Sequence, residues 1–106
     1  MKLVFNANRP CDLRKSIIEI IEEEELNTWM IHTHLGRKYL KHIGQWGEKG
    51  VIKILCDDIG ETMIVEVLKN TKSNTELEDF EGYYLGRFCE LMFVNFPNRF
   101  TSIDKE

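Results

Sequence analysis

The pattern of apolar and polar residues begins with a short apolar segment at residues 2–5, followed by turn-forming residues at 6–10. Apolar positions then recur every three or four residues through residues 10–25, which places them on one side of a helix. We therefore expect a strand at 2–5 and an amphipathic helix at 10–25, with Pro10 in the first helical turn.

Four later segments have the pattern of strands. Residues 28–35 and 38–43 alternate around Gly36, and residues 51–57 and 61–69 flank the sequence "DIG". Bulky and β-branched residues favour strands, while Asp and Gly tolerate the backbone angles of tight turns. These segments predict two β-hairpins.

A second helix is predicted after the polar sequence "NTKSNTE", because Thr75 and Glu78 have the spacing of a capping box. Its apolar stripe consists of Leu77, Phe80, Tyr84, Phe88 and Leu91. Pro97 ends the helix, since proline cannot donate the next helical hydrogen bond. We expect the tail, residues 97–106, to be loosely ordered apart from Phe100.

The element order β-α-β-β-β-β-α predicts a single α+β domain over residues 1–106. Each predicted helix has one broad apolar side that needs a partner surface. The apolar sides of both helices can be buried on the same face of a mostly antiparallel sheet, which gives a two-layer sandwich. The other sheet face must then be polar, covered by a partner, or both in part.

Charge and cysteine content narrow the class of protein. A net charge of -4 argues against a protein whose whole surface binds phosphate. With no long apolar run and no signal-peptide pattern, we expect a cytoplasmic protein. Three widely spaced cysteines, Cys11, Cys56 and Cys89, favour reduced thiols over a disulfide framework.

Residues 37–53 are the basic part of this acidic chain and have a single acid, Glu48. Their cations are Arg37, Lys38, Lys41, Lys49 and Lys53. Together with Tyr39 and Trp46 they suit a single-stranded nucleic-acid surface, or else form an ordinary solvated face. Trp46, between glycines, is either a plug for the core or an anchor for a partner.

Histidines offer a candidate metal site. His32 and His34 share one face of a predicted strand, and a turn near Gly36 would bring His42 and Lys38 to the same face. Three imidazoles are a possible zinc set. In the alternative interpretation they form the solvent-facing side of a hairpin whose other side buries Trp29, Ile31, Tyr39 and Ile43.

Cys11 follows Pro10 at a helix start, a position that lowers the pKa of a thiol. It is therefore a candidate reactive cysteine. The sequence has no P-loop, no dinucleotide-binding glycine motif, no nucleophile elbow and no zinc-protease motif. Cofactors are not expected from these patterns.

Each predicted helix also has one unusual feature. Four carboxylates, at residues 22–25, lie at the C-terminus of the first predicted helix, where the helix dipole disfavours acids. Either the basic hairpin or a cationic partner offsets their charge, or the helix ends early and the acids are solvated. Gly82 and Gly86 lie four apart, which favours close approach of a strand beneath or of the same helix in a second copy. Arg87 and Glu90 lie near the same helix margin and could pair.

These patterns favour a protein-binding domain without catalytic activity, acting as a homodimer or as a regulatory or inhibitory partner. Its many large aromatic side chains exceed what one small core holds, and interfaces favour them. The expected binding residues are Trp46, Tyr39, Lys38, Lys41, Lys49, Tyr83 and Arg87. A nucleic-acid-binding module using residues 37–53 is the first alternative, and an enzyme dependent on a metal or on a thiol is the second.

Overall fold

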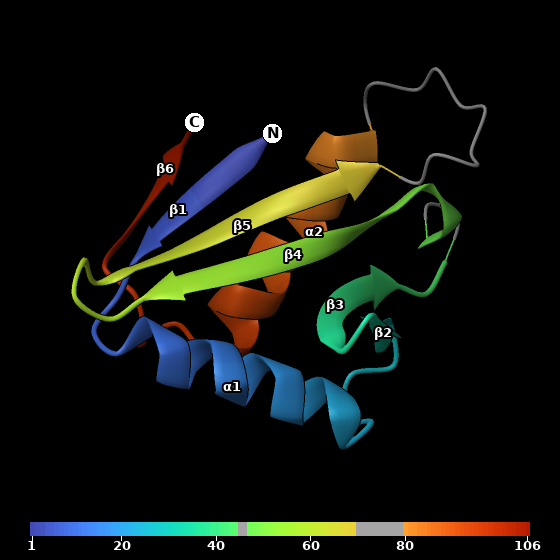
Figure 1. The fold of residues 1–106 in the computed structure, drawn as a ribbon, viewed down its shortest axis with the longest axis horizontal. Coiled ribbons are helices and arrows are strands. Elements are labelled where there is room, and N and C mark those ends of the chain that lie inside the picture. The colour runs from blue at the N-terminus through green and yellow to red at the C-terminus, as the bar shows by residue number, and fades with distance from the viewer. Residues whose placement is uncertain (45–46, 70–79) are drawn as a thin grey trace.

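The computed structural model of this chain is a six-stranded antiparallel sheet with two helices packed on one face (Figure 1). The structure describes residues 1–44, 47–69 and 80–106. Its elements are β1 (Lys2–Asn6), α1 (Pro10–Glu22), β2 (Trp29–His34), β3 (Arg37–His42), the 3-10 turn Gly47–Lys49, β4 (Gly50–Asp57), β5 (Thr62–Lys69), α2 (Phe80–Asn95) and β6 (Ser102–Lys105). The strand order is β2-β3-β4-β5-β1-β6. The predicted α+β fold is confirmed.

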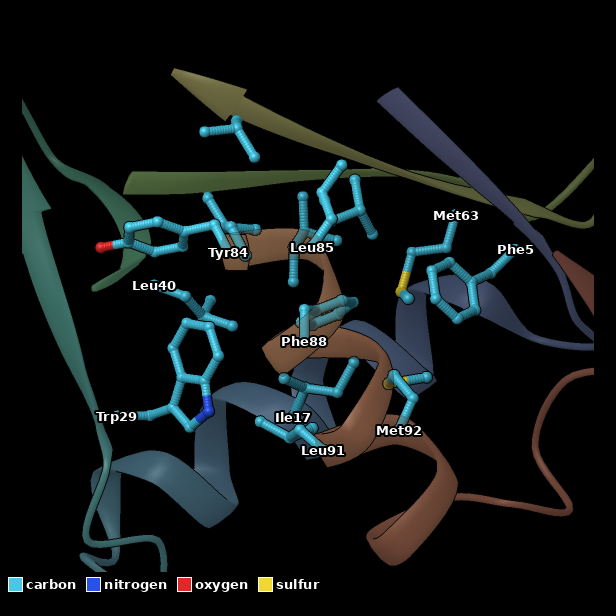
Figure 2. Close-up of a cluster of buried hydrophobic side chains, with 14 of the residues drawn as sticks. Phe5, Ile17, Trp29, Leu40, Met63, Tyr84, Leu85, Phe88, Leu91 and Met92 are labelled. Carbon is cyan, nitrogen blue, oxygen red and sulfur yellow. The ribbon is translucent and has the colours of Figure 1, made fainter. Parts of the chain in front are cut away.

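One face of the sheet forms the core, because the strand registers align the inward residues of neighbouring strands. Phe5 lies opposite Met63, and Val65 lies opposite Ile54. All four are buried, and the apolar sides of α1 and α2 pack onto them. Figure 2 shows Ile17 of α1 and Tyr84, Phe88 and Met92 of α2 meeting beneath the strands.

The hydroxyl of Tyr84 joins α2 to the segment between β3 and β4. It accepts the backbone N–H of His42 at 3.0 Å and faces the carbonyl oxygens of Gly50 at 2.9 Å and Gly47 at 3.2 Å. Burial raises the pKa of this phenol above its ordinary value. A buried hydroxyl needs such partners, so Tyr84 holds the entry to β4 against the helix.

The tail differs from the expectation that it is loosely ordered. Residues Ser102–Lys105 form β6 and pair with β1 from Leu3↔Lys105 to Asn6↔Ser102. The side-chain Nδ2 of Asn6 donates to Ser102 Oγ and Asp104 Oδ2, each at 2.9 Å. Sequence patterns give little sign of this strand, because it has one apolar residue and depends on backbone pairing with β1.

The start of α1 is fixed to the end of β4 by a disulfide and to the β4–β5 turn by a hydrogen bond. A disulfide joins Cys11 to Cys56, whose Cα atoms are 5.1 Å apart, and Asp58 Oδ1 accepts the backbone N–H of Cys11 at 3.0 Å. The expectation of reduced thiols is therefore wrong for this pair, whereas Cys89 is free. The fold brings together cysteines that are 45 residues apart, a proximity that local spacing cannot reveal.

Reduction of the Cys11–Cys56 disulfide should lower the free energy of unfolding by about 2–4 kcal/mol, because the bond closes a long loop in the unfolded chain. Denaturant unfolding with and without a reducing agent measures this change. The Cys89→Ser variant should lose as much on reduction as wild type does. An equal unfolding midpoint in both conditions would contradict the expectation.

Candidate functional site

The turn between β2 and β3 decides which side chains share a face of the sheet. Leu35 and Gly36 have φ angles of 50° and 77°, and His34 lies opposite Arg37. Two consecutive residues with positive φ form the tight turn that matches the twist of a hairpin. Glycine adopts this conformation readily, whereas leucine does so at a cost of about 1–2 kcal/mol.

This register separates the three histidines. His42 lies opposite Trp29 and is buried on the helix-covered face, whereas His32 lies opposite Tyr39 on the other face together with His34. The prediction that His42 joins the pair is wrong. A two-residue turn places it one position out of phase with them. Among the described residues no group of three His, Cys, Asp or Glu side chains is placed to hold a metal.

Two more residues of the hairpin lie on the face opposite to the one predicted. Tyr39 faces outward with His32 rather than into the core, and Lys38 faces the helices. Ile43, expected to be buried, is half exposed just beyond β3. All these differences follow from the same one-residue shift in the β2–β3 register.

His42 is a buried imidazole against aromatic rings. Its ring lies edge-on to Trp29 at 5.0 Å between centroids, and its Nδ1 has no hydrogen-bond partner among the described residues. Burial lowers its pKa below the ordinary value of 6.5, the Arg87 guanidinium lowers it further, and the Glu90 carboxylate opposes this. Burial therefore favours the neutral form of His42.

The predicted basic surface is divided by the fold. Lys38 Nζ donates to Glu22 Oε1 of α1 at 3.0 Å, and Lys41 Nζ donates to Glu48 Oε1 at 3.2 Å. Lys53 lies on the outward face opposite Glu66. Lys49 ends the 3-10 turn, and Trp46 lies outside the described residues. The fold therefore separates Lys38, which faces the helices, from Arg37, Lys41 and Lys53, which lie on the uncovered face.

Above the uncovered face of the sheet is a hollow of about 390 Å³. Its lining includes His32, His34, Tyr39, Lys41, Val51 and Leu68. The rings of His32 and His34 are nearly parallel, with centroids 6.4 Å apart. The hollow thus combines aromatic, apolar and cationic side chains, and it includes two of the predicted binding residues, Tyr39 and Lys41.

β2 is an edge strand whose free side carries backbone hydrogen-bonding groups. The N–H of Ile43 donates to the carbonyl of Thr28 at 2.7 Å, so Thr28 faces β3. Alternation then turns the backbone groups of Trp29, Ile31 and Thr33 away from β3. Within residues 1–44, 47–69 and 80–106, β2 pairs with β3 alone. Three outward N–H and C=O pairs therefore line this edge.

A groove of about 450 Å³ runs between this edge and the end of α1, and we call it the β2 groove. Its lining includes Ile21, Glu24, Leu26, Met30, Ile31 and Ile43. α1 ends at Glu22, and Glu24 has a left-handed backbone with a φ of 58°. The early helix end leaves the carboxylates of Glu23, Glu24 and Glu25 exposed, without an ion pair in the part of the chain described.

Sequence reasoning found the acids beside the β2 groove but not the groove itself. Glu22 pairs with Lys38, so the basic hairpin does offset one of the four carboxylates, as one hypothesis held. Hydrophobic periodicity does not specify strand order, and strand order alone makes β2 an edge. The feature of the sequence that could have indicated this groove is a run of acids after an amphipathic helix, followed by a strand without Lys or Pro.

α2 carries its glycines on the solvent side. A Cβ at Gly82 or Gly86 would meet nothing within 4 Å among the described residues, so the interpretation that these glycines allow close packing against a strand is wrong. Arg87 Nη1 lies 3.4 Å from Glu90 Oε2, and its Nη2 lies 3.3 Å from the Tyr83 hydroxyl. The predicted binding residues Tyr83 and Arg87 therefore lie on α2, far from the hairpin in sequence.

The candidate reactive thiol is absent, because Cys11 is joined to Cys56. No described helix has the length and apolar character needed to span a membrane. Comparisons with family models, with curated proteins and with solved structures find no match for this chain. The fold and the site geometry therefore carry the functional argument alone.

The variants Gly82→Ala and Gly86→Ala should each raise the free energy of unfolding by about 0.5–1 kcal/mol, since alanine favours a helix and the added methyl meets open space. Chemical denaturation of the single variants and of the double variant measures the effect. A loss of stability would mean that this face of α2 is packed.

The stability of the fold should decline as the pH falls below about 6.5, because unfolding lets His42 take up a proton that the folded state resists. The lowered pKa makes the unfolded state bind more protons in that range, so stability is full above it. His42→Phe should show a smaller decline between pH 8 and pH 5, with His34→Phe as an exposed control. Equal declines in wild type and His42→Phe would contradict this.

Proposed function

We propose that this chain is a protein-binding domain that takes up an extended protein segment along the free edge of β2. The observation that carries the proposal is the outward backbone groups of Trp29, Ile31 and Thr33 beside the β2 groove. A strand added to a sheet edge gains main-chain hydrogen bonds, and pockets for its alternate side chains give specificity.

The contrast between the two edges of the sheet supports this choice. Natural proteins protect edge strands with charges, proline, bulges or short length. β6 at one edge has four residues and ends in Asp104 and Lys105. β2 at the other edge has six residues, "WMIHTH", without proline or lysine. An unprotected edge of this length is a liability unless a partner uses it.

Side chains at the β2 groove define the chemistry of a fitting partner. Leu26, Met30 and Ile43 offer apolar contact, and Met30 and Ile43 are 42% and 50% exposed. Glu24 places negative charge at its rim, and Glu23 and Glu25, its neighbours in the chain, are also exposed. The groove therefore suits a segment that combines an apolar side chain with a cationic one, since complementary charge favours the correct encounter.

The two alternatives have less support. Nucleic-acid binding needs cations that follow a phosphate backbone, whereas Lys38 and Lys41 are paired with Glu22 and Glu48. An enzyme has less support because the hairpin register separates His42 from His32 and His34, and because the disulfide removes the Cys11 thiol. Protein binding uses features that remain exposed.

A photo-crosslinking amino acid at position 33, on the edge, tests the proposal in cells that express the protein. We expect adducts with protein at position 33 and none at position 59, in the remote β4–β5 turn where Ile59 is 98% exposed. Position 53, on the uncovered face, is a third probe. Protein adducts at position 59 but not at 33 would contradict the proposal, and nucleic-acid adducts at 53 alone would favour the alternative.

A further inference from the structure

We infer that the segment bound along β2 is β2 of a second copy of this chain, in a two-fold symmetric pair. This inference rests on the proposed function and names its partner. A symmetric interface requires that a surface complement itself. The two ends of β2 differ in a way that meets this requirement.

At its beginning, β2 lies beside an apolar groove with an acidic rim. Leu26, Met30 and Ile43 line the groove, and Glu24 lies at the rim. At its other end, the turn presents Leu35, which is 89% exposed. One end of the strand thus provides a recess, and the other end a projecting apolar side chain.

Leu35 also has an unfavourable conformation for its residue type. Its φ of 50° lies in the left-handed region, where asparagine or glycine is usual in this turn. An exposed leucine gains nothing from burial in the single chain and destabilises the turn that it occupies. Burial in the β2 groove of a second copy gives this side chain a favourable contact.

The backbone register follows from alternation. Only the odd-numbered residues of β2 direct backbone groups outward, and an antiparallel pair must match outward residues with one another. If Ile31 pairs with Ile31 of the second copy, Trp29 lies opposite Thr33, and all three outward residues form backbone hydrogen bonds across the pair. Continuing the same register brings Leu35 opposite Asn27 of the second copy, which lines the groove.

Charge has the same complementarity. Arg37 lies beside His34 at the turn and has no ion pair among the described residues. Because it lies on β3, it is two strand spacings, about 10 Å, from the facing strand of the second copy in the two-fold pair. An extended arginine and an extended glutamate side chain span this gap together. The exposed Glu24 and Glu25 of the second copy lie near Asn27, so each contact of unlike charge occurs twice.

The pair should be weak, because two six-residue strands and one apolar anchor at each end form an interface of small area. We expect sedimentation equilibrium to detect a monomer–dimer exchange with a dissociation constant on the order of 10 μM. A strict monomer up to about 0.5 mM would overturn the inference.

Proline at position 33 is the sharpest backbone test. Thr33→Pro removes an outward N–H without touching the β2–β3 hydrogen bonds, so the hairpin should survive while pairing weakens at least tenfold. Thr33→Ala keeps the N–H and should dimerise like wild type. Circular dichroism and thermal unfolding check that both variants fold. Equal weakening by both would overturn the backbone pairing.

Reversing the charges at the two ends of β2 tests whether the partner is a second copy, and it leaves the sequence of the strand unchanged. Arg37→Glu alone, and Glu24→Lys with Glu25→Lys, should each weaken self-association, whereas a mixture of the two proteins should form a heterodimer. Gly86→Lys, on the solvent side of α2, should leave the dimer intact. A dimer lost in Gly86→Lys but retained in Thr33→Pro would place the interface on α2 and overturn the inference.

Results for the two proposals are separable. A monomer that forms adducts with other proteins at position 33 would overturn the second-copy inference and leave the protein-binding proposal standing. Absence of both dimer and adducts would remove both. An adduct with the mass of two chains that disappears with Arg37→Glu supports both.

Discussion

The two-residue turn at Leu35 and Gly36 is the constraint on which the candidate site depends. It fixes the β2–β3 register, and side chains and backbone groups both alternate from that point. Trp29 and His42 thereby enter the core, while His32 and His34 remain outside. The same alternation leaves the backbone groups of Ile31 and Thr33 on the free edge.

Topology gives this hairpin its importance. The chain crosses from β1 through α1 to the far edge of the sheet, so β2 begins beside the end of that helix (Figure 1). The acidic residues that end α1 therefore lie next to an unprotected edge strand. The other edge is short and charged, and the helix-covered face is filled by the core. Edge, groove and acidic rim are thus consequences of a single crossover connection.

Sequence patterns predicted both hairpins, both helices and the two-layer arrangement, because each element has a strong apolar periodicity. They failed where the answer depended on one residue of register or on distant contacts. A register shifted by one residue, because the turn is centred between Leu35 and Gly36 and not on Gly36, reassigns His42, Tyr39 and Lys38 to the opposite faces. Pairing of Cys11 with Cys56 requires the finished fold.

The β6 strand and the β2 edge were missed for a related reason. β6 has a single apolar residue, and its stability comes from backbone pairing with β1. An edge position depends on strand order, which periodicity does not encode. The predicted anchor, Trp46, and the capping box at Thr75 lie outside the described residues. Of the remaining predicted binding residues, none lies on β2.

Backbone amide hydrogen exchange at increasing protein concentration tests the central claim most directly. The account predicts that the amides of Trp29, Ile31 and Thr33 exchange quickly when dilute and slow down as concentration rises. Those of Met30, His32 and His34 should be slow throughout, because they are bonded to β3. Fast exchange of the odd-numbered amides at every concentration, with new protection on α2 instead, would contradict it.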